Sequence, residues 1–351
     1  MQTPLDGKRV LITGGTGSLG QAIVRRLLTG ELGHPERITV YSRDEAKQYY
    51  MRLMYLNREV ATDDIVYRNF QQWLNFRIGD VRDYATLLQA VREAEVIIHA
   101  AALKQVPSCE YFPTEAVATN INGAINLVRA IRENDTPVER VVAISTDKAA
   151  KPINVMGMTK AVMERIFTEA NINSPRARFA CVRYGNVIAS RGSVVPLFIS
   201  QAANGGPVTV TMEEMTRFLL TLDHAVDTIF AALRTAEPGE VLVPHAPSAL
   251  IMDVARAVIG DRDIEIKITG IRPGEKIHEI MISEEESFRT VARGDFYAIR
   301  PMLPELDNGY DGKPAIEGEY SSEQVTLDQH GVYQLLEQYL DRQYAGKGIT
   351  A

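Results

Sequence analysis

The sequence predicts an α/β protein built on a Rossmann-type, doubly wound parallel sheet, and two observations lead to this fold class. Short β-branched runs alternate with helical spans in the first half of the chain. The first run is followed at once by a glycine-rich turn and an amphipathic stretch, residues 19–28. Such alternation is typical of parallel strands with helices on both faces. The strand candidates are residues 9–13, 37–41, 75–79, 96–99, 141–144 and 180–183.

Beyond about Ser190 the rhythm breaks into shorter pieces that are punctuated by Pro and Gly. We therefore expect residues 1–190 to form the sheet domain. Residues 191–351 should form mainly a smaller C-terminal lobe that binds a substrate, with some later segments returning to the sheet. A capping box at residues 326–329 predicts that the last helix begins at Thr326, and we expect it to run to about Tyr344.

Composition narrows the class of protein. The chain has 351 residues, with 45 acidic against 38 basic side chains and a net charge of -7, so we expect neither nucleic acid nor an anionic membrane surface as a partner. Two cysteines, Cys109 and Cys181, cannot build a disulfide framework, which favours a reducing cytoplasm. No apolar run approaches the roughly 18 residues of a membrane span, and none near the start is typical of a signal peptide. The six histidines show no ligand spacing, so no metal is expected. We interpret His99, at the end of an apolar run, as a core residue.

The turn after the first strand predicts a dinucleotide site. Gly14, Gly17 and Gly20 are evenly spaced between strand and helix. This spacing allows a tight turn, close approach of the backbone to a pyrophosphate and close helix packing, and the helix N-terminus stabilises the anion. The expected contacts also include Thr16, Ser18 and Leu19.

The end of the second strand indicates which dinucleotide binds. Ser42 and Arg43 suit the 2′-phosphate of NADP, whereas an acidic residue such as the following Asp44 would hold the ribose hydroxyl of NAD. We expect NADP. After the third strand, Asp80 and Val81 are placed to contact the adenine, and Asp80 or Asp83 can alternatively cap the next helix.

Eight short motifs together resemble one enzyme family. They are residues 13–20, 42–45, 100–107, 145–150, 183–186, 189–193, 215–218 and 272–276. The set is similar to the UDP-N-acetylglucosamine 4,6-dehydratases of bacterial surface-polysaccharide synthesis, which belong to the extended short-chain dehydrogenase/reductase superfamily. The resemblance covers about residues 8 to 280.

The resemblance implies a reaction in which the cofactor ends as it began. NADP takes hydride from C4 of the sugar, a base removes the C5 proton, an acid helps expel the C6 hydroxyl, and the hydride returns to C6. Lys148 is the implied base and Asp147 the implied acid. We expect nearby positive charge to lower the pKa of Lys148 and the surroundings to keep Asp147 protonated.

The active-site Tyr of many relatives is absent. The resemblance places that Tyr four residues before Lys160, where this chain has Met156, as in a recognised Met-bearing branch that includes capsule-type dehydratases. A thioether cannot carry a proton. Lys160 would then bind the nicotinamide ribose and help to deprotonate O4, with Thr146 or Asp147 in place of the phenol.

The remaining motif residues are implied contacts. Ala100 and Ala101 would line the cofactor site, and Lys104 would lie against the sugar. The uridine and diphosphate would be held by Asn186, Arg191, Arg217, Arg272 and Glu275. For the arginines, structural salt bridges are the alternative.

Three activities remain open at this stage. We expect UDP-N-acetylglucosamine 4,6-dehydration with inversion at C5, giving UDP-2-acetamido-2,6-dideoxy-beta-L-arabino-hex-4-ulose, although retaining relatives share these motifs. A UDP-sugar 4-epimerase would need no C5 base or C6 acid, so the Asp147-Lys148 pair counts against it. A nucleotide-sensing protein without activity is favoured only by Met156.

Residues 46–74 suggest self-association. They contain Trp73, the single Trp of the chain, among aromatic and basic residues of the types enriched in interfaces. These are Tyr49, Tyr50, Tyr55, Tyr67, Arg52, Arg58 and Arg68. We expect a homo-oligomer, a hexamer as the resemblance implies, although a helical insertion packed on its own subunit is the alternative.

Overall fold

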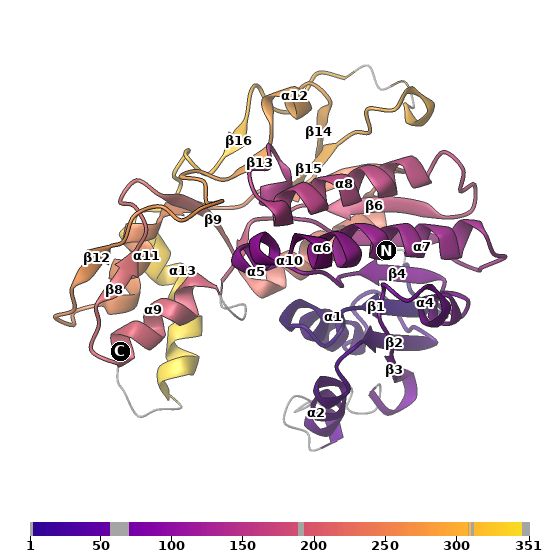
Figure 1. Cartoon of the computed structure of the whole chain (residues 1–351), viewed down its shortest axis with the longest axis horizontal. Coiled ribbons are helices and arrows are strands. Elements are labelled where there is room, and N and C mark those ends of the chain that lie inside the picture. Colours follow the sequence, from indigo (N-terminus) through magenta and orange to yellow (C-terminus); the bar gives the residue numbers. More distant parts are fainter. Residues whose placement is uncertain (1–2, 57–69, 189–192, 308, 310–311, 346–351) are drawn as a thin grey trace.

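The computed structural model describes residues 3–56, 70–188, 193–307, 309 and 312–345. Within them a nine-stranded sheet has the order β14-β15-β10-β6-β5-β4-β1-β2-β3 (Figure 1). Neighbours from β3 to β10 pair in parallel, and β15 and β14 extend this edge antiparallel. The predicted Rossmann-type sheet is confirmed. Its strands are β1 Arg9–Thr13, β2 Arg37–Ser42, β3 Leu74–Ile78, β4 Val96–His99, β5 Arg140–Ile144, β6 Arg178–Val182, β10 Val241–Pro244, β14 Thr290–Arg293 and β15 Phe296–Ile299.

Two groups of helices cover the sheet. One group includes α4, α7 and α8, which pack side by side, and in the other α1 packs against α10. Figure 1 shows α7 and α8 in front of the sheet and α10 behind it. The larger helices are α1 Ser18–Leu28, α2 Glu45–Leu56, α4 Tyr84–Val91, α7 Gly123–Arg132, α8 Val155–Ala170 and α10 Leu222–Thr235. Shorter turns are α5 Val106–Tyr111, α6 Pro113–Ala116, the π-helix η1 Val117–Asn122 and the 3-10 turn η2 Asp147–Ala149.

A second apolar core lies in the smaller lobe at the left of Figure 1. It joins α9 Val194–Ala203, α11 Ile251–Ile259 and α13 Gln329–Ala345 through buried side chains such as Phe198, Val254 and Leu336. Burial of this apolar surface gives the lobe its own source of stability. The lobe also contains β8 Val208–Val210 and β12 Ile266–Ile268, which pair in parallel.

Short strands, and C-terminal segments that pack in the large sheet domain, connect the two cores. The strands β7 Asn186–Val187, β9 Thr216–Leu220 and β11 Ser248–Leu250 form one small sheet, and β13 Ile280–Ile282 pairs with β16 Tyr320–Ser321. The remaining elements are α12 Glu284–Ser287 and η3 Pro304–Leu306. Because α10, β10, β14 and β15 pack in the large sheet domain, the C-terminal half of the chain contributes to both cores.

The predicted capping box of the last helix is wrong. Helix α13 begins at Gln329, and the Asp328 carboxylate accepts a hydrogen bond of 2.8 Å from the Gly331 N–H. The Thr326 hydroxyl instead accepts from the Ser248 N–H at 2.9 Å. Pairing with β11 therefore holds Thr326 outside the helix.

His99 is the core residue that its sequence position suggested. It is fully buried, lies 3.0 Å from the Thr13 hydroxyl through Nδ1, and meets Phe167 edge-on. Burial, with a contribution from nearby Lys160, lowers the pKa of His99 to about 3, so its ring is neutral.

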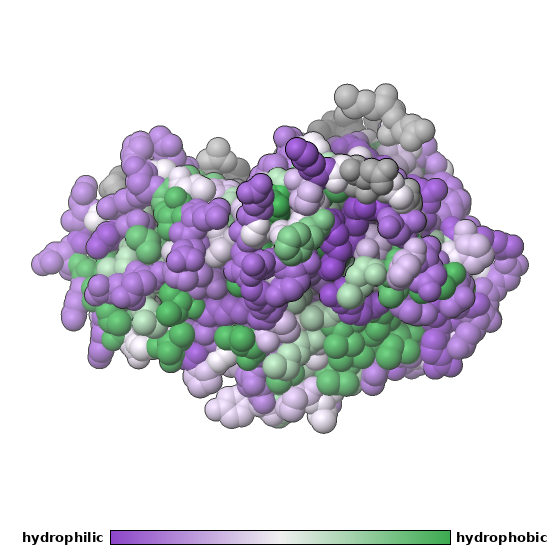
Figure 2. Space-filling view, turned by 90° about the horizontal axis from the view of Figure 1, so that it is seen from above, coloured by the Kyte–Doolittle hydropathy of each residue, from purple (hydrophilic) through white to green (hydrophobic). Residues whose placement is uncertain are grey.

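The surface is mainly hydrophilic with separate apolar patches, as Figure 2 shows for one face. No helix within the described residues is long and apolar enough to cross a bilayer. Among the same residues, no group of three or more His, Cys, Asp or Glu is arranged to hold a metal ion.

Candidate active site

A cavity of about 1370 Å³ opens between the large sheet and the smaller lobe. The carboxyl ends of β1, β2, β4 and β5 meet at one of its walls, as expected for parallel strands. Most residues predicted for the site line it. They are Gly14, Thr16, Gly17, Ser18, Leu19, Gly20, Ser42, Arg43, Asp80, Val81, Ala100, Ala101, Lys104, Thr146, Lys148, Met156, Lys160, Asn186, Arg217, Arg272 and Glu275.

The glycine turn is shaped for close approach of a ligand. Gly14 has a positive φ of 69°, and a Cβ there would lie 2.8 Å from the backbone of Ala100. A Cβ on Gly20 would lie 2.5 Å from the Gly15 Cα. No side chain of a described residue caps the N-terminus of α1, so its first N–H groups are placed to meet an anion. These features fit a dinucleotide pyrophosphate.

In the loop after β2, Arg43 and Asp44 have different partners. The Asp44 carboxylate accepts from the Lys47 N–H at 3.0 Å and pairs with the Lys47 ammonium, so it serves the start of α2. Arg43 is half exposed on the cavity wall, and its guanidinium lies 3.7 Å from an Asp80 oxygen. Ser42 accepts from the Gln48 amide. Asp44 thus bonds the start of α2, and both Arg43 and Asp44 line the cavity.

The next loop contains one helix cap and one cavity residue. Asp83 caps α4 by accepting from the Ala85 and Thr86 N–H groups, which confirms one of the two alternatives for this position. Asp80 lines the cavity and pairs with Arg82, so its contact with adenine stays a prediction.

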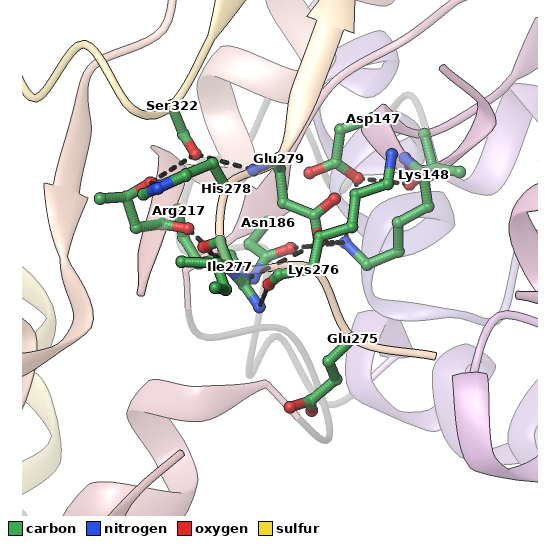
Figure 3. Close-up of polar contacts among 12 residues, drawn as sticks. Asp147, Lys148, Asn186, Arg217, Glu275, Lys276, Ile277, His278, Glu279 and Ser322 are labelled. Atoms are coloured by element: carbon green, nitrogen blue, oxygen red, sulfur yellow. Dashed lines mark hydrogen bonds and ion pairs between the residues drawn. The ribbon is translucent and has the colours of Figure 1, made fainter. Parts of the chain in front are cut away.

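Charged side chains gather where the chain leaves β5. The Thr146 hydroxyl caps the turn η2, which contains Asp147 and Lys148. Lys148 Nζ lies 3.0 Å from Asp147 Oδ1, 3.1 Å from Glu279 Oε1 and 3.3 Å from Asn186 Oδ1 (Figure 3). Asp147 is fully buried behind the cavity wall, and the Thr146 hydroxyl, which lines the cavity, donates to it at 2.8 Å. Asp147 thus reaches the cavity through Thr146 and Lys148.

Glu279 is the residue that sequence reasoning missed. It is 2% exposed and immediately precedes β13, three positions beyond the 272–276 motif. Its distance from Asp147 along the chain gave no local reason to pair them. The available signal was weak, because a Glu that begins a short apolar run is ordinarily a solvated strand end.

The electrostatics of this cluster correct one expectation. Burial alone lowers the pKa of Lys148, but the Asp147 and Glu279 carboxylates outweigh it and hold that pKa above its usual range. The predicted lowering is therefore wrong, because two carboxylates face the ammonium. Burial, aided by the Glu279 charge, raises the pKa of Asp147, which is the direction that favours its acid form.

Lys160 occupies a different environment. Its ammonium is buried and donates to the Ile144 carbonyl at 2.7 Å. No carboxylate is its hydrogen-bonding partner within the described residues, and burial lowers its pKa to about 8. Met156 lies one helical turn earlier on α8, 5% exposed, and packs in a small apolar cluster with Cys109 and Ala116.

Some of the predicted substrate contacts are exposed, and others already bond protein groups. Lys104 and Arg272 are exposed on the cavity wall, and Arg272 lies 3.7 Å from Glu275. Arg217 is buried, and its guanidinium donates to the carbonyls of residues 216, 276 and 277. Asn186 lies within the Lys148 cluster. Arg191 lies outside the described residues.

Helix α2 divides the predicted interface in a similar way. Tyr49 and Tyr50 are exposed at 56% and 65%, whereas Tyr55 is buried against Phe70. Trp73 packs on the core of its own subunit, with its ring 5.6 Å from His34. Arg58, Tyr67 and Arg68 fall outside the described residues.

The chain is similar to proteins of known family and structure. Residues 10–301 match the family described as polysaccharide biosynthesis protein. A Campylobacter jejuni protein named UDP-N-acetylglucosamine 4,6-dehydratase (inverting) is 40% identical over 311 residues, 87% of this chain and 86% of its own. A Rickettsia conorii protein named UDP-glucose 4-epimerase is 42% identical over 84% of this chain and 83% of its own. Among solved structures, Pen from Bacillus thuringiensis has a TM-score of 0.84 and 32% identity, covering 95% of this chain and 99% of its own.

Proposed function

The chain belongs to the polysaccharide biosynthesis protein family, and from this premise we propose that it is an NADP-dependent UDP-N-acetylglucosamine 4,6-dehydratase that inverts C5. One observation carries the proposal. The buried acid Asp147 and the base Lys148, which lines the cavity, adjoin the same cavity as the glycine turn. Elimination of water from a sugar needs such a pair in addition to hydride transfer.

The residues of the large domain support NADP as the cofactor. The glycine turn and the uncapped start of α1 would hold the pyrophosphate. Arg43 would meet the 2′-phosphate, since Asp44 is occupied at the start of α2. The bound nicotinamide would supply the hydride acceptor at C4 and the hydride donor at C6. Lys160 would lie beneath it, and its proximity would favour the oxyanion at O4.

Lys148 would remove the C5 proton and Asp147 would supply the proton that leaves with the C6 hydroxyl as water. Because Asp147 is buried, the Thr146 hydroxyl would pass this proton along its 2.8 Å hydrogen bond. The reactive form is the neutral pair, which differs from the ion pair by one proton moved across 3.0 Å. Burial favours neutral partners over separate charges, so this form is accessible.

The substrate would be held by other residues that line the cavity. Lys104 and Arg272 are exposed cations on its wall and would contact the sugar and the diphosphate. Glu275 would accept from the uridine or its ribose. Arg217, whose guanidinium holds the backbone of residues 276 and 277, would support this wall, and Arg191 remains a proposed phosphate contact.

The relatives carry names of two activities, so the test must separate them. A 4-epimerase has no use for a buried acid and base beside the sugar, and Met156 removes the phenol that would serve O4. Incubation of the purified protein with NADP and UDP-N-acetylglucosamine should give a product lighter by one water. In deuterated water one deuterium should appear at C5, and proton NMR should show the L-arabino configuration. An isomer of unchanged mass would establish the epimerase instead.

A binding protein without activity is disfavoured by energetics. Two buried carboxylates flank one partly buried ammonium at the cluster, and such charges are costly to bury when they only stabilise a fold. A sensing protein would bind NADP and UDP-N-acetylglucosamine, and the sugar would keep its mass and gain no deuterium.

We further propose a homo-oligomer, a hexamer, with α2 at a subunit contact. Tyr49 and Tyr50 are exposed aromatic residues of a type enriched in interfaces. Apolar residues of the α7 and α8 face, such as Ile125, Met158 and Val162, are exposed as well and offer a second contact. Light scattering on a Tyr49→Ser, Tyr50→Ser variant tests the first surface, and an unchanged mass would exclude α2.

A further inference from the structure

Glu279 joins the Lys148 cluster from a distant part of the chain. Its Oε1 lies 3.1 Å from Lys148 Nζ and 3.8 Å from Arg217 Nε. Its Oε2 is buried without a hydrogen-bond partner within the described residues, and so is Oδ2 of Asp147. The Glu279 carboxylate pairs with the Lys148 ammonium and lies near Asp147, so its charge acts on the two residues proposed as base and acid.

The backbone of Glu279 is held more firmly than its position in a loop suggests. Its N–H donates to the Ser322 hydroxyl at 2.9 Å, and its carbonyl accepts from the Ser322 N–H at 2.8 Å. The Ser322 hydroxyl also lies 2.8 Å from that of Thr216, which lies 2.8 Å from Nδ1 of His278 (Figure 3). Residues from β9 and the end of β16 therefore fix the point from which the Glu279 side chain extends.

We propose that Glu279 is a positioning residue whose carboxylate holds the Lys148 ammonium against Asp147 and sets the charge state of that pair. The contact between Glu279 and Lys148 is a feature of the structure. The effect of this contact on water elimination rests on the proposed dehydratase function.

The charged groups around Lys148 show the direction of the effect. Asp147 and Glu279 face it as carboxylates, and Arg217 and Lys276 approach as cations. Burial lowers the pKa of Lys148 and raises the pKa of Asp147, because it opposes charge on both groups. The negative charge of Glu279 raises both pKa values. Removal of that single negative charge should therefore move both titrations to lower pH.

The first experiment needs no activity. Competitive acetylation of the full-length protein with acetic anhydride across pH, followed by mass spectrometry of the Lys148 peptide, gives the midpoint of Lys148 directly. In Glu279→Gln this midpoint should fall by about one pH unit or more. The matched control is Glu240→Gln, which removes a carboxylate that is also 2% exposed but pairs with Arg293. This control should leave the Lys148 midpoint unchanged, and an unchanged midpoint in Glu279→Gln would overturn the proposal.

The parent protein provides a test that does not depend on the folding of a variant. Its Lys148 midpoint should lie above the ordinary lysine value of about 10.4. A Lys148 midpoint below that value would overturn the proposal, because burial would then outweigh both carboxylates.

The second experiment is the pH profile of water elimination. Both limbs should move to lower pH in Glu279→Gln, and Glu279→Asp, which keeps the charge, should restore them toward the parent. A purely structural role would lower the rate with both limbs unmoved, which contradicts the proposal. If the parent releases no water, the proposed function fails, and the Lys148 labelling still decides the role of Glu279.

Discussion

The glycine turn and the Lys148 cluster line one cavity but are built differently. The turn uses residues 13–20, one strand end and one helix start, and relies on the absence of side chains and on backbone N–H groups. The cluster joins η2, β7 and the residue before β13, and it relies on buried charge. A turn that suits a dinucleotide can be encoded locally, whereas this cluster of charges requires long-range contacts.

Lys148 and Lys160, two lysines that line the cavity, differ in the groups that surround their ammonium ions. Lys148 is surrounded by carboxylates, which hold its pKa above the usual range despite burial. Lys160 has a carbonyl as its hydrogen-bonding partner, and burial lowers its pKa to about 8. Two residues of one type, twelve positions apart, are thus prepared for different tasks by their partners.

The largest expected effect tests the cluster. Lys148→Ala should lower the rate of product formation by about a thousandfold or more, because it removes the group that takes the C5 proton. Binding of NADP and UDP, measured by fluorescence titration, should change little, since the proposed role belongs to the transition state. Exchange of deuterium into C5 should vanish as well.

The matched control for that variant is Lys267→Ala, which removes an exposed lysine from β12. It should retain the parent rate. A Lys148→Ala protein that turns over within about tenfold of the parent would assign the base to another residue.

Lys160 offers a test through stability. The lowered pKa means that burial of its charge opposes folding, and Lys160→Met should stabilise the protein by about 3 kcal/mol at pH 7. Between about pH 8 and 10.5 the unfolded chain binds the proton more tightly, so the stability of the parent rises across this window. Thermal melting of both proteins should therefore show an advantage for the variant that fades toward pH 10.5. An equal difference at every pH would show that packing, and not charge, causes it.

Arg43 tests the cofactor wall. Arg43→Ala should weaken NADP by about 1.5 to 3 kcal/mol, the value of a hydrogen bond to a charged group, and leave NAD nearly unchanged. Fluorescence titration with both dinucleotides measures the difference. Arg37→Ala, at the opposite end of β2 and partly exposed, is the control and should bind both as the parent does. Equal losses for the two cofactors in Arg43→Ala would remove Arg43 from the phosphate site.

The smallest expected effect concerns Met156. Met156→Leu should cost less than about tenfold in turnover, because a similar apolar body can pack against Cys109 and Ala116. Met156→Ala should lower the melting temperature by leaving a cavity, with turnover again within about tenfold. A loss near a thousandfold in the leucine variant would reveal a role of the thioether in catalysis.

Much of the fold was predictable because its signals are local. Alternating apolar runs gave the six strands from β1 to β6 within one or two residues of their observed ends. The capping box at Thr326 failed for the opposite reason, since pairing with Ser248 outweighs a local preference for the helix start. Local patterns predict structure reliably where no distant partner competes for the same group.

The sequence by itself determined the glycine turn and the placement of Thr146, Asp147, Lys148, Met156 and Lys160 close to one another after β5, since these five lie within one strand-turn-helix unit. Only the tertiary structure decided which charges face Lys148. Glu279 and Arg217 reach the cluster through β13 and β9, and a side-chain pKa depends on what surrounds it in space. The sequence analysis expected positive charge near Lys148, and the fold adds the Glu279 carboxylate to that of the neighbouring Asp147. Electrostatic interactions act across short distances in space whatever the separation along the chain, which is why the chemistry of this site could not be derived from its motifs alone.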